Sequence, residues 1–462
     1  MSYLYGVVLA AGQGTRMKSK HSKVMHALCG KPMVGHVVDG LKETGVQQII
    51  LVVGHKAEEV KAYLKDQVEY VTQEEQKGTA HAVLQVGPIL ANKKGTTLIV
   101  MGDSPLLTSK TLGALIEEHQ KKNQAATILT TKLENPTGYG RIIRDGNGNV
   151  LRIVEEKDAS AKEKEIQEVN TGTYCFDNEK LFFALSKVKN DNVQGEYYLT
   201  DVIEILRNEG EKIGAYQTID ANETIGINDR IALAKAEEIL RTQIVEQHMK
   251  NGVTIVDPKT TYIEKGVVIG SDTIIYPNTY LRGNTTIGHD CTIGPNVELI
   301  DVIVNDDVKI THSVIYSSKI ASKAIIGPFA YIRPGSEIGE SVKVGDFVEI
   351  KNSKIGKESK VPHLSYIGDT TIGENVNIGA GTITVNYDGY RKHRTEIGDR
   401  SFIGCNTNLV APVTVGNDVY VAAGSTITEN VPDFSLAIAR ERQVNKEGYV
   451  KKIRERNNSK ES

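Results

Sequence analysis

The chain has 462 residues, enough for two or three domains. Its 55 lysines and arginines are balanced by 58 aspartates and glutamates, so the net charge is −3 and no basic excess is available for a nucleic-acid backbone. The four cysteines form no CxxC pair, no apolar run is long enough to span a membrane, and the N-terminus lacks the charged region of a signal peptide. We therefore predict a cytoplasmic protein that neither binds nucleic acid nor enters a membrane.

The first half of the chain alternates short apolar runs with helical segments. The runs "YGVVLAA", "QQIILVVG" and "TTLIVMGD" are rich in Val, Ile and Thr, and segments such as "MVGHVVDGLKETG" lie between them. This alternation predicts a Rossmann-like α/β domain with a mostly parallel sheet over residues 1–228. Ligands bind such sheets beyond the carboxyl ends of the strands, which is where "LAAGQGTR" and "MGDSP" fall.

The segment "LAAGQGTRM" directly follows the first apolar run. Glycines after a strand let a phosphate approach main-chain N–H groups. A P-loop is excluded because Gly14 is followed by Thr15, and a dinucleotide fingerprint is excluded because Met17 stands where a third small residue is needed. The remaining pattern, G-x-G-T-R, predicts a phosphate site, and a turn with a surface arginine is the alternative.

The pattern changes near residue 228. Residues 229–251 have apolar side chains at helical spacing and end at an Asn-Gly pair, which predicts a helical linker. Residues 252–462 form the second predicted domain, which ends in a polar C-terminal tail. As far as Ile427, its aliphatic residues recur every six positions, as in Ile269, Ile275, Leu281, Ile287 and Ile293, then Val302, Val308, Val314 and Ile320. This period predicts a left-handed parallel β-helix of hexapeptide repeats. The repeat breaks between Thr384 and Ile397, where an excursion from a rigid solenoid suits a binding loop.

These motifs resemble two known families. The first half resembles sugar-nucleotide pyrophosphorylases in "LAAGQGTRM", "QEEQKGTAHA", "GDSPLL", "GYGRII", "VEEKDA" and "VNTGTY". The second half resembles hexapeptide-repeat acyltransferases. Joined in this order, with "VPHLSYIGD" and "NIGAGTITVNYDG", the chain resembles the bacterial bifunctional N-acetylglucosamine-1-phosphate uridyltransferases/glucosamine-1-phosphate N-acetyltransferases over nearly its whole length.

The resemblance implies two reactions that lead to UDP-N-acetylglucosamine, a precursor of peptidoglycan and the outer envelope. The C-terminal domain would acetylate glucosamine 1-phosphate with acetyl-CoA. The N-terminal domain would then transfer a uridylyl group from UTP to N-acetylglucosamine 1-phosphate and release pyrophosphate. The resemblance also implies Mg²⁺ as cofactor and a homotrimer, in which the acetyltransferase site forms between neighbouring prisms.

Uridylyl transfer depends mainly on charge neutralisation and positioning. The resemblance implies that Arg16 and Lys23 are catalytic and neutralise the phosphates, and that Asp103 and Asn228 hold Mg²⁺. The implied UTP- and UDP-N-acetylglucosamine-binding residues are Leu9, Ala10, Ala11, Gly12, Lys23, Gln73, Gly78, Thr79, Gly140, Glu155, Asn170 and Asn228. From the residues alone, Asp103 could lie in a turn, Asn228 could cap a helix, and Glu155 could belong to a solvated charged face.

Acetyl transfer to an amine needs a base, a polarised carbonyl and aligned substrates. The resemblance implies that His363 is the base and that Asn386 donates to the developing oxyanion, with Glu349 as a further candidate for orienting the amine. It implies glucosamine-1-phosphate binding by Arg333, Lys351, Tyr366, Asn377 and Lys392. It implies acetyl-CoA binding by Ala380, Asn386, Tyr387, Cys405, Ala423 and Arg440. Cys405 stands where the family commonly has serine. A structural histidine at position 363 and mere solvated charge at Lys392 are the alternatives.

Two other hypotheses remain open from the residues. In the first, the chain is a pyrophosphorylase whose solenoid only assembles or regulates the enzyme, although such a prism has no need of His363, Lys351, Asn386 and Lys392. In the second, the chain is a non-catalytic scaffold, which does not require Arg16, Lys23 or Asp103.

Overall fold

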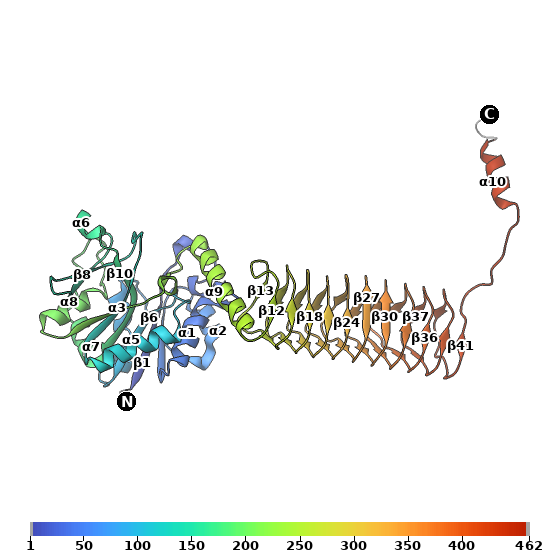
Figure 1. The fold of residues 1–462 in the computed structure, drawn as a ribbon, viewed down its shortest axis with the longest axis horizontal. Coiled ribbons are helices and arrows are strands. Elements are labelled where there is room, and N and C mark those ends of the chain that lie inside the picture. The colour runs from blue at the N-terminus through green and yellow to red at the C-terminus, as the bar shows by residue number, and fades with distance from the viewer. Residues whose placement is uncertain (1–2, 459–462) are drawn as a thin grey trace. The chain divides into compact units, whose positions relative to one another are not determined.

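The computed structural model describes residues 3–458, and its contacts divide the chain into two units between Ile244 and Val245 (Figure 1). This division falls inside α9 (Arg230–Lys250), the helix that occupies the predicted linker. The first part of α9 belongs to unit 1, where Ala236 packs with Leu28, Met33, Leu106 and Ile227 in a small buried cluster. Each unit has its own core and is described by itself.

Unit 1 is built on a sheet whose main path is β11-β7-β10-β6-β1-β4-β5, with the hairpin β8–β9 beside β10. The pairs β1/β4, β1/β6, β4/β5 and β7/β11 are parallel, and β10 runs antiparallel to β6 and β7. The predicted mostly parallel α/β sheet is confirmed. Its strands are β1 (Leu4–Ala10), β4 (Gln48–Val53), β5 (Glu69–Thr72), β6 (Thr96–Met101), β7 (Ala126–Lys132), β8 (Arg141–Arg144), β9 (Val150–Val154), β10 (Glu168–Asp177) and β11 (Ile213–Gln217).

Alternate side chains of each strand enter two cores on opposite faces of the sheet. In β1, Val7 and Leu9 enter one core, and Val8 and Ala10 enter the other. Helices α3 (Thr79–Leu84), α4 (Gly87–Leu90), α7 (Asn178–Leu185) and α8 (Asp201–Asn208) pack in the first core. Helices α1 (Met33–Glu43), α2 (Ala57–Leu64) and α5 (Ser109–Lys121) pack in the second. The loops between strands and helices therefore gather at the ends of the strands.

The remaining elements of unit 1 are short. They are the 3₁₀ turns η1 (Thr15–Met17), η2 (Lys23–Met25), η3 (Lys65–Gln67) and η4 (Ala221–Thr224), the two-stranded ribbon of β2 (Ala27–Leu28) and β3 (Lys31–Pro32), and helix α6 (Ala161–Lys164). Both η1 and η2 belong to the chain that follows β1, so the glycine-rich segment leads directly into them.

Unit 2 is a left-handed parallel β-helix of hexapeptide repeats, as predicted, and its strands stack into three sheets (Figure 1). The first prism sheet contains β12 (Thr254–Ile255), β15 (Ile274–Ile275), β18 (Thr292–Ile293), β21 (Lys309–Ile310), β24 (Ile325–Ile326), β27 (Lys343–Asp346), β30 (Lys360–His363), β33 (Asn377–Ile378), β36 (Phe402–Ile403), β39 (Tyr420–Val421) and β41 (Leu436–Ala437). The second contains β13 (Tyr262–Ile263), β16 (Tyr280–Arg282), β19 (Glu298–Ile300), β22 (Val314–Tyr316), β25 (Tyr331–Ile332), β28 (Glu349–Lys351), β31 (Tyr366–Gly368), β34 (Ile383–Val385), β37 (Asn408–Val410) and β40 (Thr426–Ile427). The third contains β14 (Val268–Ile269), β17 (Thr286–Ile287), β20 (Ile303–Val304), β23 (Lys319–Ile320), β26 (Glu337–Ile338), β29 (Lys354–Ile355), β32 (Thr370–Ile372), β35 (Thr395–Ile397) and β38 (Val413–Val415). Helix α10 (Tyr449–Asn458) follows.

The aliphatic residues of the repeat fill the interior of the prism, but the predicted series is out of register from Val302 to Val314. Val302 and Val308 are buried but precede the strands β20 and β21, whose inward aliphatic residues are Val304 and Ile310. The structure buries Ile315 and leaves Val314 half-exposed, so Ile315 rather than Val314 continues the interior stack. The cause is that Ile310, Ile315 and Ile320 are five residues apart, because the turns between these strands are one residue shorter. A strict period of six therefore misplaces the side chain that points inward.

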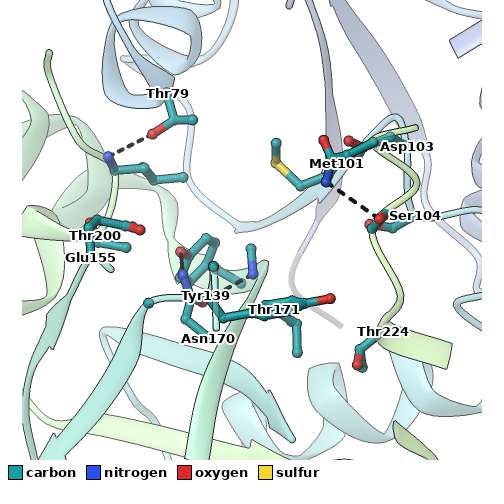
Figure 2. A pocket seen from close by; sticks show the side chains of 17 residues that line it. Thr79, Met101, Asp103, Ser104, Tyr139, Glu155, Asn170, Thr171, Thr200 and Thr224 are labelled. Atoms are coloured by element: carbon teal, nitrogen blue, oxygen red, sulfur yellow. Dashed lines mark hydrogen bonds between the residues drawn. The ribbon is translucent and has the colours of Figure 1, made fainter. Parts of the chain in front are cut away.

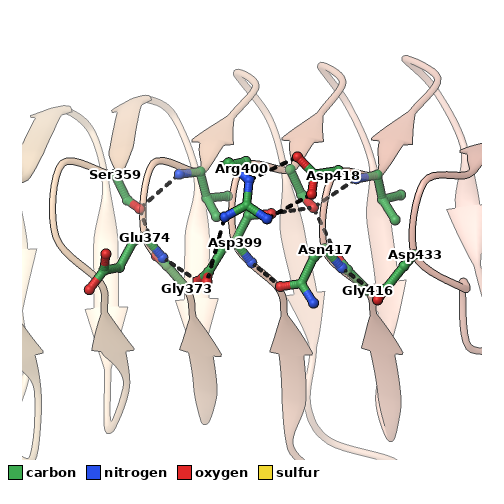
Figure 3. A network of polar contacts seen from close by, with 12 residues as sticks. Ser359, Gly373, Glu374, Asp399, Arg400, Gly416, Asn417, Asp418 and Asp433 are labelled. Atoms are coloured by element: carbon green, nitrogen blue, oxygen red, sulfur yellow. Dashed lines mark hydrogen bonds and ion pairs between the residues drawn. The ribbon is translucent and has the colours of Figure 1, made fainter.

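Polar side chains at one edge of the prism tie each coil to the next (Figure 3). Asp399 Oδ1 accepts the backbone N–H of Glu374, Asn417 Oδ1 accepts that of Asp399, and each bond is 2.8 Å long. A Cβ on Gly373 would lie 2.2 Å from Asp399 Oδ1, so the side chain from the following coil requires glycine there. At other repeat glycines the nearest atom belongs to the backbone of the next coil, as at Gly339, where a Cβ would lie 2.6 Å from the Ile355 carbonyl oxygen. Close approach of successive coils is therefore the physical reason for the recurring Gly-x-x of the repeat.

Candidate active sites

Unit 1 contains a cavity of about 250 Å³ beside the carboxyl end of β6 (Figure 2). Six residues singled out from the sequence line it, namely Thr79, Asp103, Gly140, Glu155, Asn170 and Asn228. The sequence analysis did not single out several other lining residues, among them Met101, Ser104, Tyr139, Thr171, Thr200 and Thr224. Tyr139 lies in the motif "GYGRII", and Thr224 precedes Asn228 by four residues. Their positions in or near residues already singled out are the sequence signal that could have identified them.

One side of this cavity is formed by Gly140, Glu155 and Asn170. The Asn170 N–H donates to the Gly140 carbonyl at 2.9 Å, and a Cβ on Gly140 would lie 3.4 Å from Glu155 Oε2. Thr200 Oγ1 donates to Glu155 Oε1 at 3.3 Å, and burial raises the pKa of the Glu155 carboxyl. The other carboxylate oxygen, Glu155 Oε2, accepts no hydrogen bond from residues 3–458. This side can therefore accept a hydroxyl donor such as a sugar.

A second group of side chains brings together four residues that are far apart in the sequence. The Lys23 ammonium bonds Asp103 Oδ2 and donates to Asn228 Oδ1 at 2.7 Å. Arg16 donates to the same Asn228 oxygen at 2.9 Å. A Cβ on Gly14 would lie 2.6 Å from Lys23 Cβ, so the bare backbone of the glycine-rich segment lets Lys23 reach this position. The two cations are placed to meet phosphate groups.

The oxygens of Asp103 and Asn228 also fit a hard divalent cation. Both lie within hydrogen-bonding reach of one ammonium group, so they converge on a common point. Among residues 3–458, no three carboxylate, histidine or cysteine side chains are grouped as a metal cage. Mg²⁺ is commonly held by one or two protein oxygens together with phosphates and water, which is what this pair can provide.

The expected nucleotide residues lie at the ends of β1 and β5. Leu9, Ala10 and Ala11 are buried at the end of β1, and Gly12 is exposed beyond it. The Gln73 side chain is buried, and its Nε2 donates to the Gly78 carbonyl at 3.2 Å. The Oε1 oxygen of Gln73 can accept a hydrogen bond from a nucleobase.

Gly78 and Thr79, which follow β5, contact the loop before α8. A Cβ on Gly78 would lie 2.5 Å from the Tyr197 carbonyl oxygen, so only glycine allows this approach. The Leu199 N–H donates to Thr79 Oγ1 at 3.0 Å, which joins the start of α3 to the cavity. The assignment of these residues to a nucleotide stays a prediction.

In unit 2, a charged cluster lies on the second prism sheet and on the loop that interrupts the repeat between Thr384 and Ile397, here called the inserted loop. Arg333 donates to Glu349 Oε1 at 2.8 Å, and Tyr366 follows on the next coil, where β28 pairs with β31. The pKa of Lys392 is lowered by its contact with Lys351 and by the like charge of that ammonium. Two adjacent ammonium groups repel each other, and a bound phosphate relieves that repulsion.

Asn386 lies at the base of this cluster with its amide already engaged. Its Nδ2 donates to Asp369 Oδ2 at 2.5 Å and to the Tyr366 hydroxyl at 3.4 Å, and the residue is 6% exposed. Asn352 donates to the other oxygen of Asp369 at 2.6 Å. Burial raises the pKa of Asp369, but the two amide donors together with the charges of Lys351 and Lys392 lower it more, so the carboxyl stays ionised. Asp369, which sequence analysis missed, therefore orients Asn386 and through it Tyr366.

The inserted loop is closed by Asp388. Its carboxylate accepts hydrogen bonds from the N–H groups of Tyr390 and Arg391 and from His393 Nε2, at 2.7, 2.6 and 2.7 Å. These bonds hold the pKa of Asp388 far below its usual range. Tyr387 is exposed and pairs with Lys392 across the loop. The loop is thus an ordered platform that presents Lys392.

His363 lies at the edge between the first and second prism sheets, together with most of the expected acetyl-CoA residues. Backbone bonds from Asn406 to Ala380 and from Gly424 to Cys405 align successive coils, so that Ala380, Cys405 and Ala423 follow one another along this edge. Cys405 is exposed, and the side chain of Arg440 lies near Gly424. This row of small residues leaves an open path along the prism edge beside His363.

Asn377 is the expected sugar-phosphate residue that the structure separates from the others. It lies on β33 of the first prism sheet, whereas Lys351 and Tyr366 lie on the second. Outward side chains of two different sheets of one prism point in different directions. The described residues of one chain therefore do not gather the whole expected acetyltransferase site.

The fold and the two sites define a nucleotidyltransferase unit followed by a hexapeptide-repeat transferase unit. The nucleotidyl transferase family model matches residues 5–234, and the bacterial transferase hexapeptide (six repeats) model matches residues 266–301, 317–352 and 394–429. Curated relatives of this chain carry the name bifunctional protein GlmU. The relative from Brevibacillus brevis is 58% identical over 98% of this chain and 98% of its own length. Those from Geobacillus sp. and Bacillus subtilis are 59% and 56% identical, each over 98% of this chain and 99% of its own.

The chain therefore belongs to the family of bifunctional GlmU proteins. It is a bifunctional enzyme with a uridyltransferase and an acetyltransferase activity, as predicted from the motifs. None of the helices within residues 3–458 is long and apolar enough to cross a membrane.

Proposed function

We propose that unit 2 acetylates the amine of glucosamine 1-phosphate with acetyl-CoA and that unit 1 joins the product to UMP from UTP. The observation that carries this proposal is the presence of a paired cationic site in each unit. Arg16 and Lys23 converge in unit 1, and Lys351 and Lys392 lie together in unit 2. Each pair suits a phosphate, and both substrates of the proposed sequence carry one. We place the enzyme in the cytoplasm, where UTP and acetyl-CoA are available.

In unit 1, the phosphate oxygen of N-acetylglucosamine 1-phosphate attacks the α-phosphorus of UTP, and the bond to pyrophosphate breaks. Arg16 and Lys23 stabilise the charge that builds up on the phosphates. Glu155, Gly140 and Asn170 hold the sugar on the opposite side of the cavity, at the hydroxyl-accepting carboxylate described above. Leu9–Gly12, Gln73, Gly78 and Thr79 hold the nucleotide.

We propose that Mg²⁺ binds between Asp103 and Asn228. When bound, the metal neutralises phosphate charge and orients the nucleotide. The protein supplies one carboxylate oxygen and one amide oxygen, which lie within reach of the same ammonium. Lys23 shares these oxygens, so it also balances the Asp103 charge.

In unit 2, His363 takes a proton from the sugar amine as the nitrogen attacks the thioester carbonyl. A C–N bond forms, the C–S bond breaks, and CoA leaves as a thiol after it gains a proton. Arg333, Lys351 and Lys392 bind the phosphate, Tyr366 and Asn377 hold the sugar, and Ala380, Tyr387, Cys405, Ala423 and Arg440 line the path of CoA. Asn386 stabilises the oxyanion that develops on the acetyl carbonyl. It does so with its own amide or through the Tyr366 hydroxyl that this amide contacts.

We further propose that the active enzyme is a homotrimer. Asn377 faces a different side of the prism from Lys351, so a site that uses both needs a second copy. An apolar ridge lies beside His363 at the same edge. It consists of Phe329, Phe347 and Leu364, which are 55, 60 and 63% exposed, and the two phenylalanine rings stack at 5.5 Å. A contiguous apolar ridge of this kind suits a protein interface.

A coupled assay tests the two activities together. The purified full chain is mixed with glucosamine 1-phosphate, acetyl-CoA, UTP and Mg²⁺, each omitted in turn, and free thiol and pyrophosphate are followed. We expect thiol without UTP, and pyrophosphate only when acetyl-CoA or preformed N-acetylglucosamine 1-phosphate is present. Pyrophosphate from the preformed sugar with no thiol under any condition would refute the assignment of acetylation to unit 2.

A further inference from the structure

His363 has a carboxylate partner on the preceding coil. Asp346 ends β27 and His363 ends β30, and the two residues are paired in the parallel register of these strands. His363 Nδ1 lies 2.7 Å from Asp346 Oδ1, so the imidazole donates to the carboxylate. The side chains are 39% exposed for Asp346 and 58% exposed for His363. The pair therefore lies at the surface of the prism edge, open to a substrate.

The backbone around this pair fixes its geometry. The Leu364 N–H donates to the Asp346 carbonyl at 2.9 Å, which joins the two coils immediately beside the side chains. A Cβ on Gly345 would lie 1.8 Å from the Pro362 carbonyl oxygen, so glycine alone allows the coils to approach this closely. Ser365 Oγ donates to the His363 carbonyl at 2.8 Å. Hydrogen bonds to the backbone carbonyls of Asp346 and His363 therefore hold both residues in place, in addition to the bond between their side chains.

The hydrogen bond determines which ring nitrogen can act as a base. A proton held at Nδ1 by the carboxylate leaves the lone pair on Nε2, and the ring then presents Nε2 away from Asp346. When Nε2 takes the proton of the amine, the resulting imidazolium is stabilised by the neighbouring negative charge. Bonding to His363 lowers the pKa of Asp346, so this carboxyl is ionised at neutral pH.

We propose that Asp346 is a positioning residue for acetyl transfer, which holds His363 in the Nδ1-protonated tautomer and stabilises the imidazolium that forms. This inference rests on the proposed role of His363 as the base. Asp346 acts through His363 and needs no contact with either substrate, so its removal is expected to slow the chemical step and leave substrate binding unchanged.

The test compares Asp346→Ala, Asp346→Asn and His363→Ala in the full chain, with Asp290→Asn as a control that removes one exposed carboxylate at an earlier turn. Uridyltransferase activity in each preparation checks that the chain is folded, and sedimentation checks its oligomeric state. We expect Asp346→Ala to lower the acetyltransferase kcat by about 10-fold or more and to change KM for glucosamine 1-phosphate by less than about twofold. We expect a higher kcat for Asp346→Asn than for Asp346→Ala, because the amide oxygen can accept a hydrogen bond from the Nδ1–H group. It should stay below the parent kcat, because the amide carries no negative charge.

The outcomes separate this inference from the proposed function. If His363→Ala keeps its acetyltransferase activity, the proposed base is wrong. If His363→Ala loses activity while Asp346→Ala keeps its kcat, or shows only a raised KM, the positioning role of Asp346 is overturned and His363 stands.

A spectroscopic readout tests the tautomer directly. The protein labelled with ¹⁵N-histidine is compared with His363→Ala to identify the ring signals of His363. We expect a protonated Nδ1 in the parent chain and a shift towards the Nε2-protonated form in Asp346→Ala. The same tautomer in both proteins would overturn the proposal.

Discussion

The Lys23 ammonium joins Asp103 to Asn228, the two residues proposed to hold Mg²⁺. The residues come from three separate segments of unit 1, yet one charged group lies within reach of both oxygens. A divalent cation bound there would therefore compete with the Lys23 ammonium for the same pair of oxygens. Nucleotide phosphates reduce this competition because they offer Lys23 an alternative anionic partner.

Replacement of Lys23 is expected to separate metal binding from catalysis. Lys23→Gln removes the competing cation, so it should bind Mn²⁺ more tightly than the parent in the absence of nucleotide, and it should lose phosphate stabilisation in the reaction. Titration of Mn²⁺ followed by its electron paramagnetic resonance signal measures the first effect. Asp103→Asn is the matched control, because it removes a ligand and should weaken Mn²⁺ binding. Equal or weaker Mn²⁺ binding by Lys23→Gln would contradict the shared site.

The apolar ridge beside His363 is expected to control assembly. Phe347→Asp places a charge in the proposed interface, which costs at least about 2 kcal/mol of association free energy at each contact. Sedimentation should show dissociation, with loss of acetyltransferase activity and retention of uridyltransferase activity. Phe434→Asp, another exposed phenylalanine in a later turn outside the ridge, provides the comparison. A Phe347→Asp protein that stays trimeric would show that the ridge is not the interface.

The buried His119 is expected to make unit 1 less stable in acid. Burial lowers its pKa from 6.5 to about 4, and its Nδ1 lies 2.9 Å from Thr127 Oγ1. The unfolded chain gains a proton first as the pH falls, so stability is full above pH 6.5 and is lost between 6.5 and about 4, by about 1.4 kcal/mol per unit at most.

Urea unfolding followed by circular dichroism at 222 nm measures this effect, because the helices α1 to α8 belong to unit 1. His119→Gln should be less stable than the parent at pH 7.5 but should show a smaller loss on going to pH 5. If both proteins lose the same stability between these pH values, the acid sensitivity comes from another group.

Cys405 is expected to be the cysteine that reacts first with thiol reagents. Cys29, Cys175 and Cys291 are buried and Cys405 is exposed, and burial raises the pKa of Cys175 and of Cys291. Iodoacetamide should therefore modify Cys405 at least roughly 10-fold faster than the others, and acetyl-CoA should slow the reaction if it covers this edge. Peptide mass analysis with Cys405→Ser as control measures both rates. Labelling that is insensitive to acetyl-CoA would place the CoA path elsewhere.

The sequence by itself determined the two architectures, because each depends on local periodicity. The alternation of apolar runs and helical segments predicted the α/β sheet, and the six-residue repeat predicted the β-helix, in which each short strand buries one aliphatic side chain. The glycine-rich segment and the motifs around Lys23 and His363 also identified the family, since their residue types and spacings are specific. These features need no knowledge of contacts between distant residues.

Only the tertiary structure decided which side chains meet. Lys23 and Asn228 are 205 residues apart, and the sheet brings them to one edge. Asp346 and His363 face each other because they are 17 residues apart, whereas the preceding coil, from Ile326 to Val344, is one residue longer. The same variation puts Ile315 inside the prism in place of Val314. A shift of one residue turns a side chain to the opposite face of a strand, so register, which depends on packing across coils, had to come from the fold.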